Sequence, residues 1–299
     1  MKLILILGLV LGLNLFAAES ANEENIDYTK IEDPETQEWI DNWLDGNFGL
    51  KPHKVNYILP ISYRLGDDSY KAFNQPLPFK HTEAELQVSL KLSVGGDLFG
   101  LNEKYYLAYS HLAFWQIYTD SSPFRETNYS PEAFVVFPIK DANSLFQLRN
   151  IKLGLGHISN GQGETHGAQY EYHYQDPDNQ SRSLNFIYTE FTLQHNSIIT
   201  SLKLWYRLPE DIAADDNPDY TDYTGNAEIN LNYFYKQHKF ALMGRYNIST
   251  NYGAAKLTYS YPLIKDVYFF SKIFHGYGES LIDYNNELTK VAVGFSFSR

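Results

Sequence analysis

The chain has 299 residues, a formal net charge of −12 and no cysteine. The acidic balance excludes nonspecific nucleic-acid binding, which needs a basic surface, and the lack of cysteine excludes disulfide and thiol chemistry. The 25 Tyr and 19 Phe residues favour aromatic-rich strands, including those that form the girdles of outer-membrane barrels.

The first 18 residues have the plan of a secretory signal peptide. Lys2 precedes an apolar run from Leu3 to Leu13, and the small residues Ala17 and Ala18 follow. The run is shorter than the about 20 apolar residues of a transmembrane helix. We therefore expect cleavage near Ala18, with an uncleaved anchor as the alternative. The acidic segment 19–50 comes next, and we expect it to lie outside the main fold.

From residue 51 to residue 299 the hydrophobic pattern has a period of two. In ELQVSLKLSV (85–94), apolar residues occupy every second position and polar residues occupy the positions between them. Similar runs occur at 201–208, 228–236 and 290–298. Successive side chains of a strand point to opposite faces, so this alternation predicts β-strands.

Two all-β architectures fit such strands, a soluble sandwich and a membrane barrel. The runs are near ten residues long, which is about the length of a tilted membrane strand. One face of each run is also polar or charged, whereas a small soluble barrel fills its interior with apolar side chains. We therefore expect a closed antiparallel transmembrane β-barrel spanning 51–299.

The stretch GHISNG (156–161) places two polar side chains on the expected outer face. His157 and Ser159 share the parity of Leu155, and in the next strand Asn185 shares the parity of Ile187. A serine, a histidine and an asparagine on one surface have the composition of a nucleophile, a base and a group that orients the base. The plain alternative is a polar pair at the rim, where water satisfies both side chains.

Five stretches of the sequence resemble the bacterial outer-membrane phospholipase A family. They are SSPFRETNY (121–129), HISNGQ (157–162), SRSLN (181–185), NPDYTDY (217–223) and GYGESLIDYN (276–285). The resemblance implies a twelve-stranded antiparallel barrel in the outer membrane of Gram-negative bacteria. It also implies hydrolysis of acyl esters of phospholipids and lysophospholipids at either glycerol position (phospholipase A1 and A2 activity), with a calcium requirement, a homodimeric active form and no nucleotide cofactor.

The same resemblance implies roles for individual residues. The catalytic set comprises the nucleophile Ser159, the general base His157 and the orienting residue Asn185. The oxyanion and calcium set comprises the backbone N–H of Gly161, the backbone carbonyl of Gln162, Ser181, and Ser121 from the other subunit. Acyl chains would then lie in the groove between the two barrels.

The sequence departs from the family pattern at several places. Gln162 stands where the family commonly has arginine, and the loop 163–180 is much longer than a tight turn. His111 stands where the family has a glutamine in its dimer interface. Two other functions compete: a non-catalytic barrel, either porin-like or structural, and a soluble secreted esterase. A channel has no use for an outward-facing trio of His157, Ser159 and Asn185, and a soluble enzyme needs no detergent.

Overall fold

The structure is a computed structural model, and it describes residues 33–34, 36–37, 50–66, 79–139, 147–163, 172–176 and 179–298. The expected signal peptide, most of the segment 19–50, and much of the loop 163–180 lie outside the described residues. None of the helical segments in the described part of the chain has the length and apolar character that a membrane-spanning helix requires.

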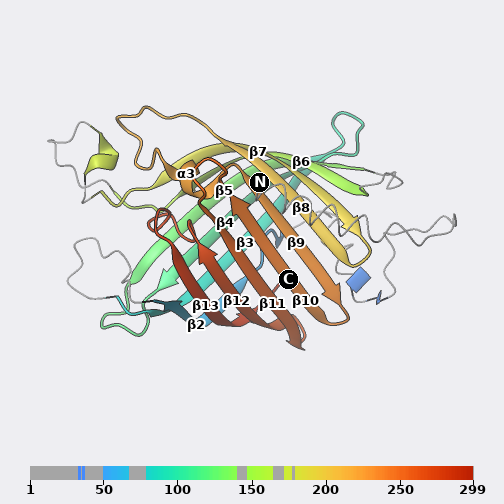
Figure 1. Cartoon of the computed structure of the whole chain (residues 1–299). Coiled ribbons are helices and arrows are strands. Elements are labelled where there is room, and N and C mark those ends of the chain that lie inside the picture. The colour runs from blue at the N-terminus through green and yellow to red at the C-terminus, as the bar shows by residue number, and fades with distance from the viewer. Residues whose placement is uncertain are drawn as a thin grey trace.

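Thirteen strands form one antiparallel sheet, which Figure 1 shows as a closed barrel of tilted strands. The strands are β1 (Leu50–Pro52), β2 (Tyr57–Leu65), β3 (Thr82–Gly96), β4 (Lys104–Trp115), β5 (Phe124–Pro138), β6 (Leu148–Ser159), β7 (Ser183–His195), β8 (Ile198–Arg207), β9 (Ala227–Tyr235), β10 (His238–Tyr246), β11 (Gly253–Ile264), β12 (Val267–Gly276) and β13 (Leu288–Ser296). The connections contain a 3-10 helix, η1 (His173–Gln175), and a short helix, α3 (Tyr220–Thr224).

The barrel proper has twelve strands, as the family resemblance implied. Each strand from β2 to β13 pairs with its sequence neighbours, and β13 pairs back with β2 to close the sheet. The short strand β1 pairs with the same edge of β3 as β2 does. Pro52 lies opposite Leu90 and Tyr57 lies opposite Gln87, so four residues of one strand face two of the other. β1 and β2 are therefore one strand interrupted by a bulge at 53–56.

The side chains are arranged with apolar residues outside and charged residues inside. Val88, Leu155 and Ile187 are 54%, 60% and 47% exposed on the outer surface, whereas Glu85 and Lys290 are fully buried. This distribution of apolar and charged side chains is the reverse of that in a soluble protein. It matches a barrel whose outer band faces lipid. The polar inward face predicted from the alternation is confirmed.

Paired charges fill part of the barrel interior. Lys290 Nζ lies 2.9 Å from Glu83 Oε1, 2.7 Å from Glu85 Oε1 and 3.0 Å from Glu279 Oε2. Arg125 Nε donates to Glu83 Oε2 at 2.8 Å, and its guanidinium also pairs with Asp283. Buried charges are tolerated only when they are paired, so this cluster both fills the interior and couples strands that are distant in the sequence.

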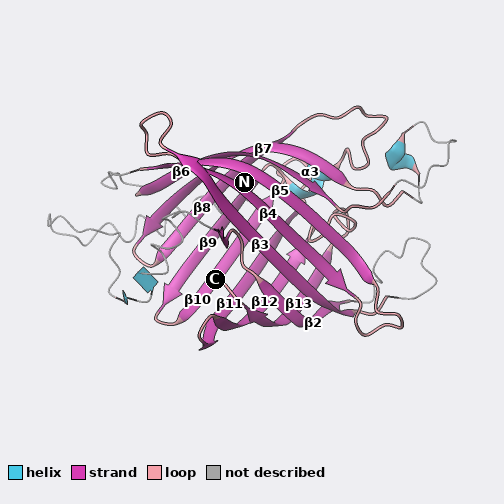
Figure 2. Cartoon of the chain, turned by 180° about the vertical axis from the view of Figure 1, so that it is seen from behind, coloured by secondary structure: helices cyan, strands magenta, loops and turns pink. Residues whose placement is uncertain are grey.

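The two ends of the barrel differ. One end carries the short turns of β7–β8, β9–β10 and β11–β12, and the other carries long connections at 160–182, 208–226 and 277–287. Figures 1 and 2 show α3 at the end with the long connections. Because β6 ends and β7 begins there, Ser159 and Ser183 both lie at this rim.

Candidate active site

The centre of the candidate site is a histidine paired with an asparagine across two strands. His157 on β6 lies directly opposite Asn185 on β7 in the antiparallel register. Opposite residues of such a pair project to the same face, so their side chains meet outside the barrel. His157 Nδ1 and Asn185 Oδ1 are 2.9 Å apart, which is hydrogen-bond distance. The neighbouring outward residues Leu155 and Ile187 belong to the apolar band.

Ser159 is the last residue of β6 and has the parity of His157, so both side chains leave the same face of the strand. It lies opposite Ser183 on β7 and opposite Tyr129 on β5. Within the described part of the chain, no hydrogen bond joins the Ser159 hydroxyl to the imidazole of His157. Such contacts are often loose without substrate and tighten when it binds.

A carboxylate lies on the far side of Asn185. Asn185 Nδ2 donates to Glu210 Oε1 at 3.3 Å, and the backbone N–H of Leu208 donates to the Asn185 carbonyl at 2.8 Å. Two hydrogen bonds thus attach the connection after β8 to this one residue. Sequence reasoning missed Glu210, because it follows Pro209 beyond the alternating run and no periodicity identifies which way it points.

The loop that follows Ser159 is held by the buried side chain of Asn160. Its Nδ2 donates to the Gln180 carbonyl at 2.7 Å, and its Oδ1 accepts from the Arg182 N–H at 3.0 Å and the Gln162 N–H at 3.3 Å. One amide therefore joins the two ends of the β6–β7 connection. The sequence motif contained Asn160, but nothing in the motif indicated this role.

Gly161 has a conformation and a neighbour that both require glycine. Its φ is +66°, and a Cβ at this position would lie 2.8 Å from Cε2 of Tyr129. The ring of Tyr129 also packs against the ring of His111, with centroids 4.9 Å apart. A contiguous path of packed side chains thus runs on the outer surface from His111 to the turn beside Ser159.

The acidic stretch at 215–219 is packed into the rim, with Asp215 and Asp216 buried and Asp219 half-buried. Asp215 accepts from Arg207 Nη2 at 2.6 Å, and Asp216 accepts from Asn179 Nδ2 at 2.7 Å. Asp219 accepts from the hydroxyl of Tyr284. Burial, together with that hydrogen bond, raises the pKa of the Tyr284 hydroxyl above its ordinary value. These contacts tie the three long connections into one rim around the site.

The expected calcium residues offer oxygen atoms of a suitable kind. Gln162 and Ser121 are exposed, Ser181 is half-buried, and the three supply hydroxyl and carbonyl oxygens, which calcium accepts as ligands. Ser181 is placed by its backbone N–H, which donates to Asn179 Oδ1 at 2.9 Å. Among the described residues no cluster of His, Asp and Glu side chains is suited to a metal ion. The oxygen ligands that these three residues offer fit calcium, and all of them are neutral.

Ser121 lies on a different connection from Gln162 and Ser181. It lies in the turn before β5, at φ +62°, whereas Gln162 and Ser181 flank the β6–β7 connection.

A family model for phospholipase A1 matches residues 36–297 of the chain. Phospholipase A1 of Salmonella typhimurium is 32% identical over 253 residues, covering 84% of this chain and 82% of the relative. Phospholipase A1 of Escherichia coli K12 has the same identity and coverage. The outer-membrane phospholipase of Salmonella typhi, solved as a dimer with bound calcium, superposes with a TM-score of 0.73 at 31% identity, covering 86% of this chain and 96% of that chain.

A further solved structure is an active-site variant of the Escherichia coli outer-membrane phospholipase A, in which an asparagine is replaced by alanine. It superposes with a TM-score of 0.72 at 32% identity, covering 86% of this chain and 96% of that chain.

The barrel, its apolar outer band and these similarities define an enzyme of the bacterial outer membrane that crosses the membrane with β-strands. The chain belongs to the outer-membrane phospholipase A family, whose members are phospholipase A1 enzymes.

Proposed function

We propose that the protein is a calcium-dependent hydrolase of acyl esters in phospholipids and lysophospholipids, acting as a homodimer at the lipid-facing surface of its barrel. The observation that carries the proposal is the 2.9 Å contact of His157 Nδ1 with Asn185 Oδ1 outside the barrel, with Ser159 two residues along the same face. An ester embedded in the membrane reaches this surface directly, without passing through the barrel interior.

In the proposed reaction, the Ser159 hydroxyl oxygen attacks the ester carbonyl carbon while His157 Nε2 takes the hydroxyl proton. The tetrahedral intermediate collapses, and the C–O bond to the glycerol breaks. The imidazolium of His157 returns its proton to the departing alcohol. Water, activated by the same nitrogen, then releases the fatty acid from Ser159. Asn185 holds the ring so that Nε2 stays available for both proton transfers.

The oxyanion needs donors at the end of β6. We assign one donor role to the backbone N–H of Gly161, whose left-handed conformation turns the chain two residues after Ser159. Gln162 and Ser181 of one subunit would hold calcium together with Ser121 of the partner subunit. When bound, calcium supplies positive charge close to the developing oxyanion.

Two features of the relatives support the finer parts of the proposal. The Salmonella typhi protein was solved as a dimer with calcium, and an asparagine belongs to the active site of the Escherichia coli protein. The calcium-bound dimer agrees with a set of calcium ligands drawn from two subunits. The active-site asparagine agrees with the place of Asn185 beside His157.

The deciding experiment is acyl release from phospholipid micelles by the refolded protein, with calcium, with a chelator and with Ser159→Ala. Activity that requires both calcium and Ser159 supports the proposal. A folded, dimeric wild-type protein that releases no fatty acid in calcium overturns it and directs attention to conductance measurements, which test for a passive barrel. Lysophospholipid as the substrate tests the second activity separately.

A further inference from the structure

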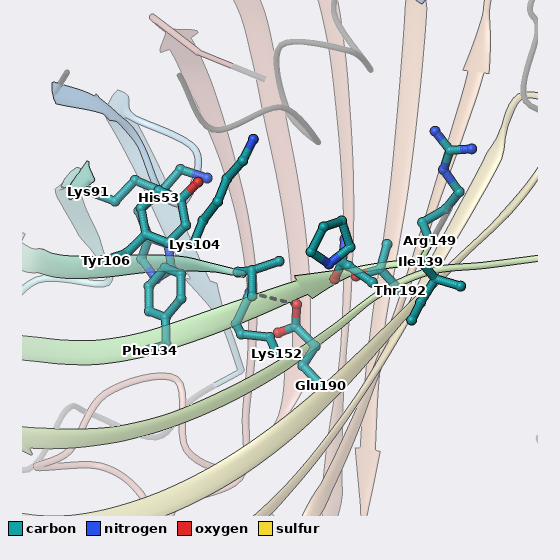
Figure 3. Close-up of a pocket in the computed structure, with 13 residues that line it drawn as sticks. His53, Lys91, Lys104, Tyr106, Phe134, Ile139, Arg149, Lys152, Glu190 and Thr192 are labelled. Atoms are coloured by element: carbon teal, nitrogen blue, oxygen red, sulfur yellow. Dashed lines mark hydrogen bonds and ion pairs between the residues drawn. The ribbon is translucent and has the colours of Figure 1, made fainter. Parts of the chain in front are cut away.

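A basic cavity lies in the barrel interior, at the end opposite the candidate active site. Its volume is about 310 Å³, and its lining comes from β3 to β7 and from the bulge between β1 and β2. Figure 3 shows Lys91, Lys104, Lys152 and Arg149 around it, with Glu190 ion-paired to Lys152. The walls are inward-facing side chains, so the cavity is reached through the barrel mouth and not from the lipid.

Positive charge in this cavity is in excess. Four of its lining side chains are cationic and Glu190 is the one carboxylate among them, already 2.7 Å from Lys152 Nζ. Among the described residues, no carboxylate lies within ion-pair distance of Lys91, Lys104 or Arg149. The excess occurs in a chain whose formal net charge is −12, so it is a local feature of this site.

Aromatic rings hold two of the ammonium groups in place. Lys91 Nζ lies 5.2 Å from the centroid of Tyr106, and Lys152 Nζ lies 5.2 Å from that of Phe134. The two rings stack with centroids 5.1 Å apart. Cation–π contacts restrict lysine side chains that would otherwise be mobile, so the charges form a positioned set.

We propose that this cavity binds small, soluble, phosphate-bearing anions. Lysine ammonium groups and an arginine guanidinium are the protein groups that best complement phosphate oxygens, and the guanidinium can donate two parallel hydrogen bonds. The volume is near the lower end of small-molecule sites, about 300–1,000 Å³, which suits inorganic phosphate or glycerol 3-phosphate. Four cations in a site of this size favour a small charged ligand over an acyl chain.

The test is isothermal titration of the refolded full-length protein, in nonionic detergent at constant ionic strength, with inorganic phosphate and, separately, glycerol 3-phosphate. Saturable binding should weaken at least about tenfold in the double variant Lys91→Gln/Lys104→Gln. Lys265→Gln, an exposed lysine in the β11–β12 turn of the same rim, should leave it unchanged. If both anions saturate the site, inorganic phosphate is sufficient for binding. If only glycerol 3-phosphate saturates it, the ligand is an organic phosphate. Absence of saturation by either anion, or equal weakening in Lys265→Gln, overturns the proposal.

A second, independent observation concerns the Glu210 carboxylate beside Asn185. A carboxylate only accepts hydrogen bonds, so its contact with Asn185 Nδ2 at 3.3 Å fixes which end of the amide faces it. The amide oxygen must then face His157 Nδ1, which is 2.9 Å away. That oxygen accepts, so Nδ1 carries the proton and Nε2 is left as the acceptor nitrogen.

We infer that Glu210 is a positioning residue that sets the amide orientation of Asn185 and, through it, the tautomer of His157. The inference rests on the proposed function. The Leu208 N–H, bonded to the Asn185 carbonyl at 2.8 Å, anchors the chain one residue before Pro209. The fixed φ of that proline then limits the backbone paths that lead to Glu210.

The experiment compares Glu210→Ala and Glu210→Gln with wild type by acyl-release kinetics and by ¹⁵N NMR of the His157 ring. Glu210→Ala should lower kcat about tenfold with KM little changed and should mix the two tautomers. Glu210→Gln keeps an acceptor oxygen and should restore most of both signals. Glu287→Ala, an exposed carboxylate on another long connection, should leave both at the wild-type level.

An unchanged kcat and tautomer in Glu210→Ala, with activity still abolished by Ser159→Ala, overturns the positioning role and leaves the proposed function intact. If Ser159→Ala retains full activity, the proposed function itself fails, so the two failures are distinguishable.

Discussion

The side-chain amide of Asn160 bridges the backbone at Gln180, with Nδ2 donating to the carbonyl oxygen at 2.7 Å. The two residues are 20 apart in the chain, and they stand at opposite ends of the β6–β7 connection. Asn160 directly follows Ser159, the last residue of β6. Its amide therefore also holds the end of the strand that carries the candidate nucleophile.

Replacement of Asn160 by alanine should therefore loosen the rim and lower activity together. The change removes the hydrogen bond that Asn160 donates to the Gln180 carbonyl and the one that it accepts from the Arg182 N–H. Each lost hydrogen bond costs about 1–3 kcal/mol of stability when its partner is left buried and unpaired. We expect faster proteolytic cleavage within 160–182 and slower acyl release. Asn160→Asp keeps the acceptor and should give an intermediate result. Wild-type cleavage and activity in Asn160→Ala would argue against this role.

Gly161→Ala should reduce acyl release by up to about 10²–10³-fold, the loss that follows removal of one oxyanion donor. The added Cβ would lie 2.8 Å from the Tyr129 ring at a φ of +66°, so the turn that presents the Gly161 N–H must shift. Gly163→Ala is the matched control, since nothing lies within 4 Å of a Cβ there. Equal activity of the two variants would mean that the conformation of Gly161 has no part in the reaction.

Removal of calcium by a chelator should abolish acyl release, and readdition should restore it. In Ser181→Ala, the calcium concentration for half-maximal activity should rise, because one of a few oxygen ligands is lost. Ser249→Ala changes an exposed serine of the β10–β11 turn and should keep the wild-type calcium dependence. Activity that survives exhaustive chelation would contradict the calcium requirement, and a normal half-point in Ser181→Ala would remove that residue from the ligand set.

Lys290→Met should destabilise the barrel by about 3–5 kcal/mol, because it leaves buried carboxylates without their cation. The Lys290 ammonium lies within 3.0 Å of oxygens from Glu83, Glu85 and Glu279, and its side chain is fully buried. Glu287→Gln also removes an ion pair, which Glu287 forms with His275 when the imidazole is protonated, but the two side chains are 55% and 62% exposed. That control should cost about 0–1 kcal/mol. Urea unfolding in detergent measures both, and similar losses would show that burial does not set the cost.

The direction of side chains could be predicted from the sequence, because a strand alternates strictly. Val88 and Leu155 were expected outside and are exposed there. The same alternation expected His157 and Asn185 to emerge on one outer surface, and the structure places them opposite each other in the register. A local period is enough for such predictions because it does not depend on distant parts of the chain.

Pairings between distant residues could not be predicted in the same way. Glu83 and Lys290 are both polar positions of an alternating strand, but nothing in either strand indicates that they meet across 207 residues of chain. Glu210 and Asp215 lie in a connection without periodicity, where direction is set by contacts with other loops. The bulge at 53–56 likewise depends on the register of β1 and β2 against β3.

The pairing of Glu83 with Lys290 also bears on how the barrel is assembled. Glu83 stands on the second strand of the barrel and Lys290 on the last, so the lysine arrives with the final part of the chain. Until it does, the carboxylates of Glu83 and Glu85 on β3 lack one of their cations. Pairing of β13 with β2 therefore closes the barrel and neutralises these carboxylates in the same step. A barrel that lacks its last strand keeps an excess of negative charge in its interior.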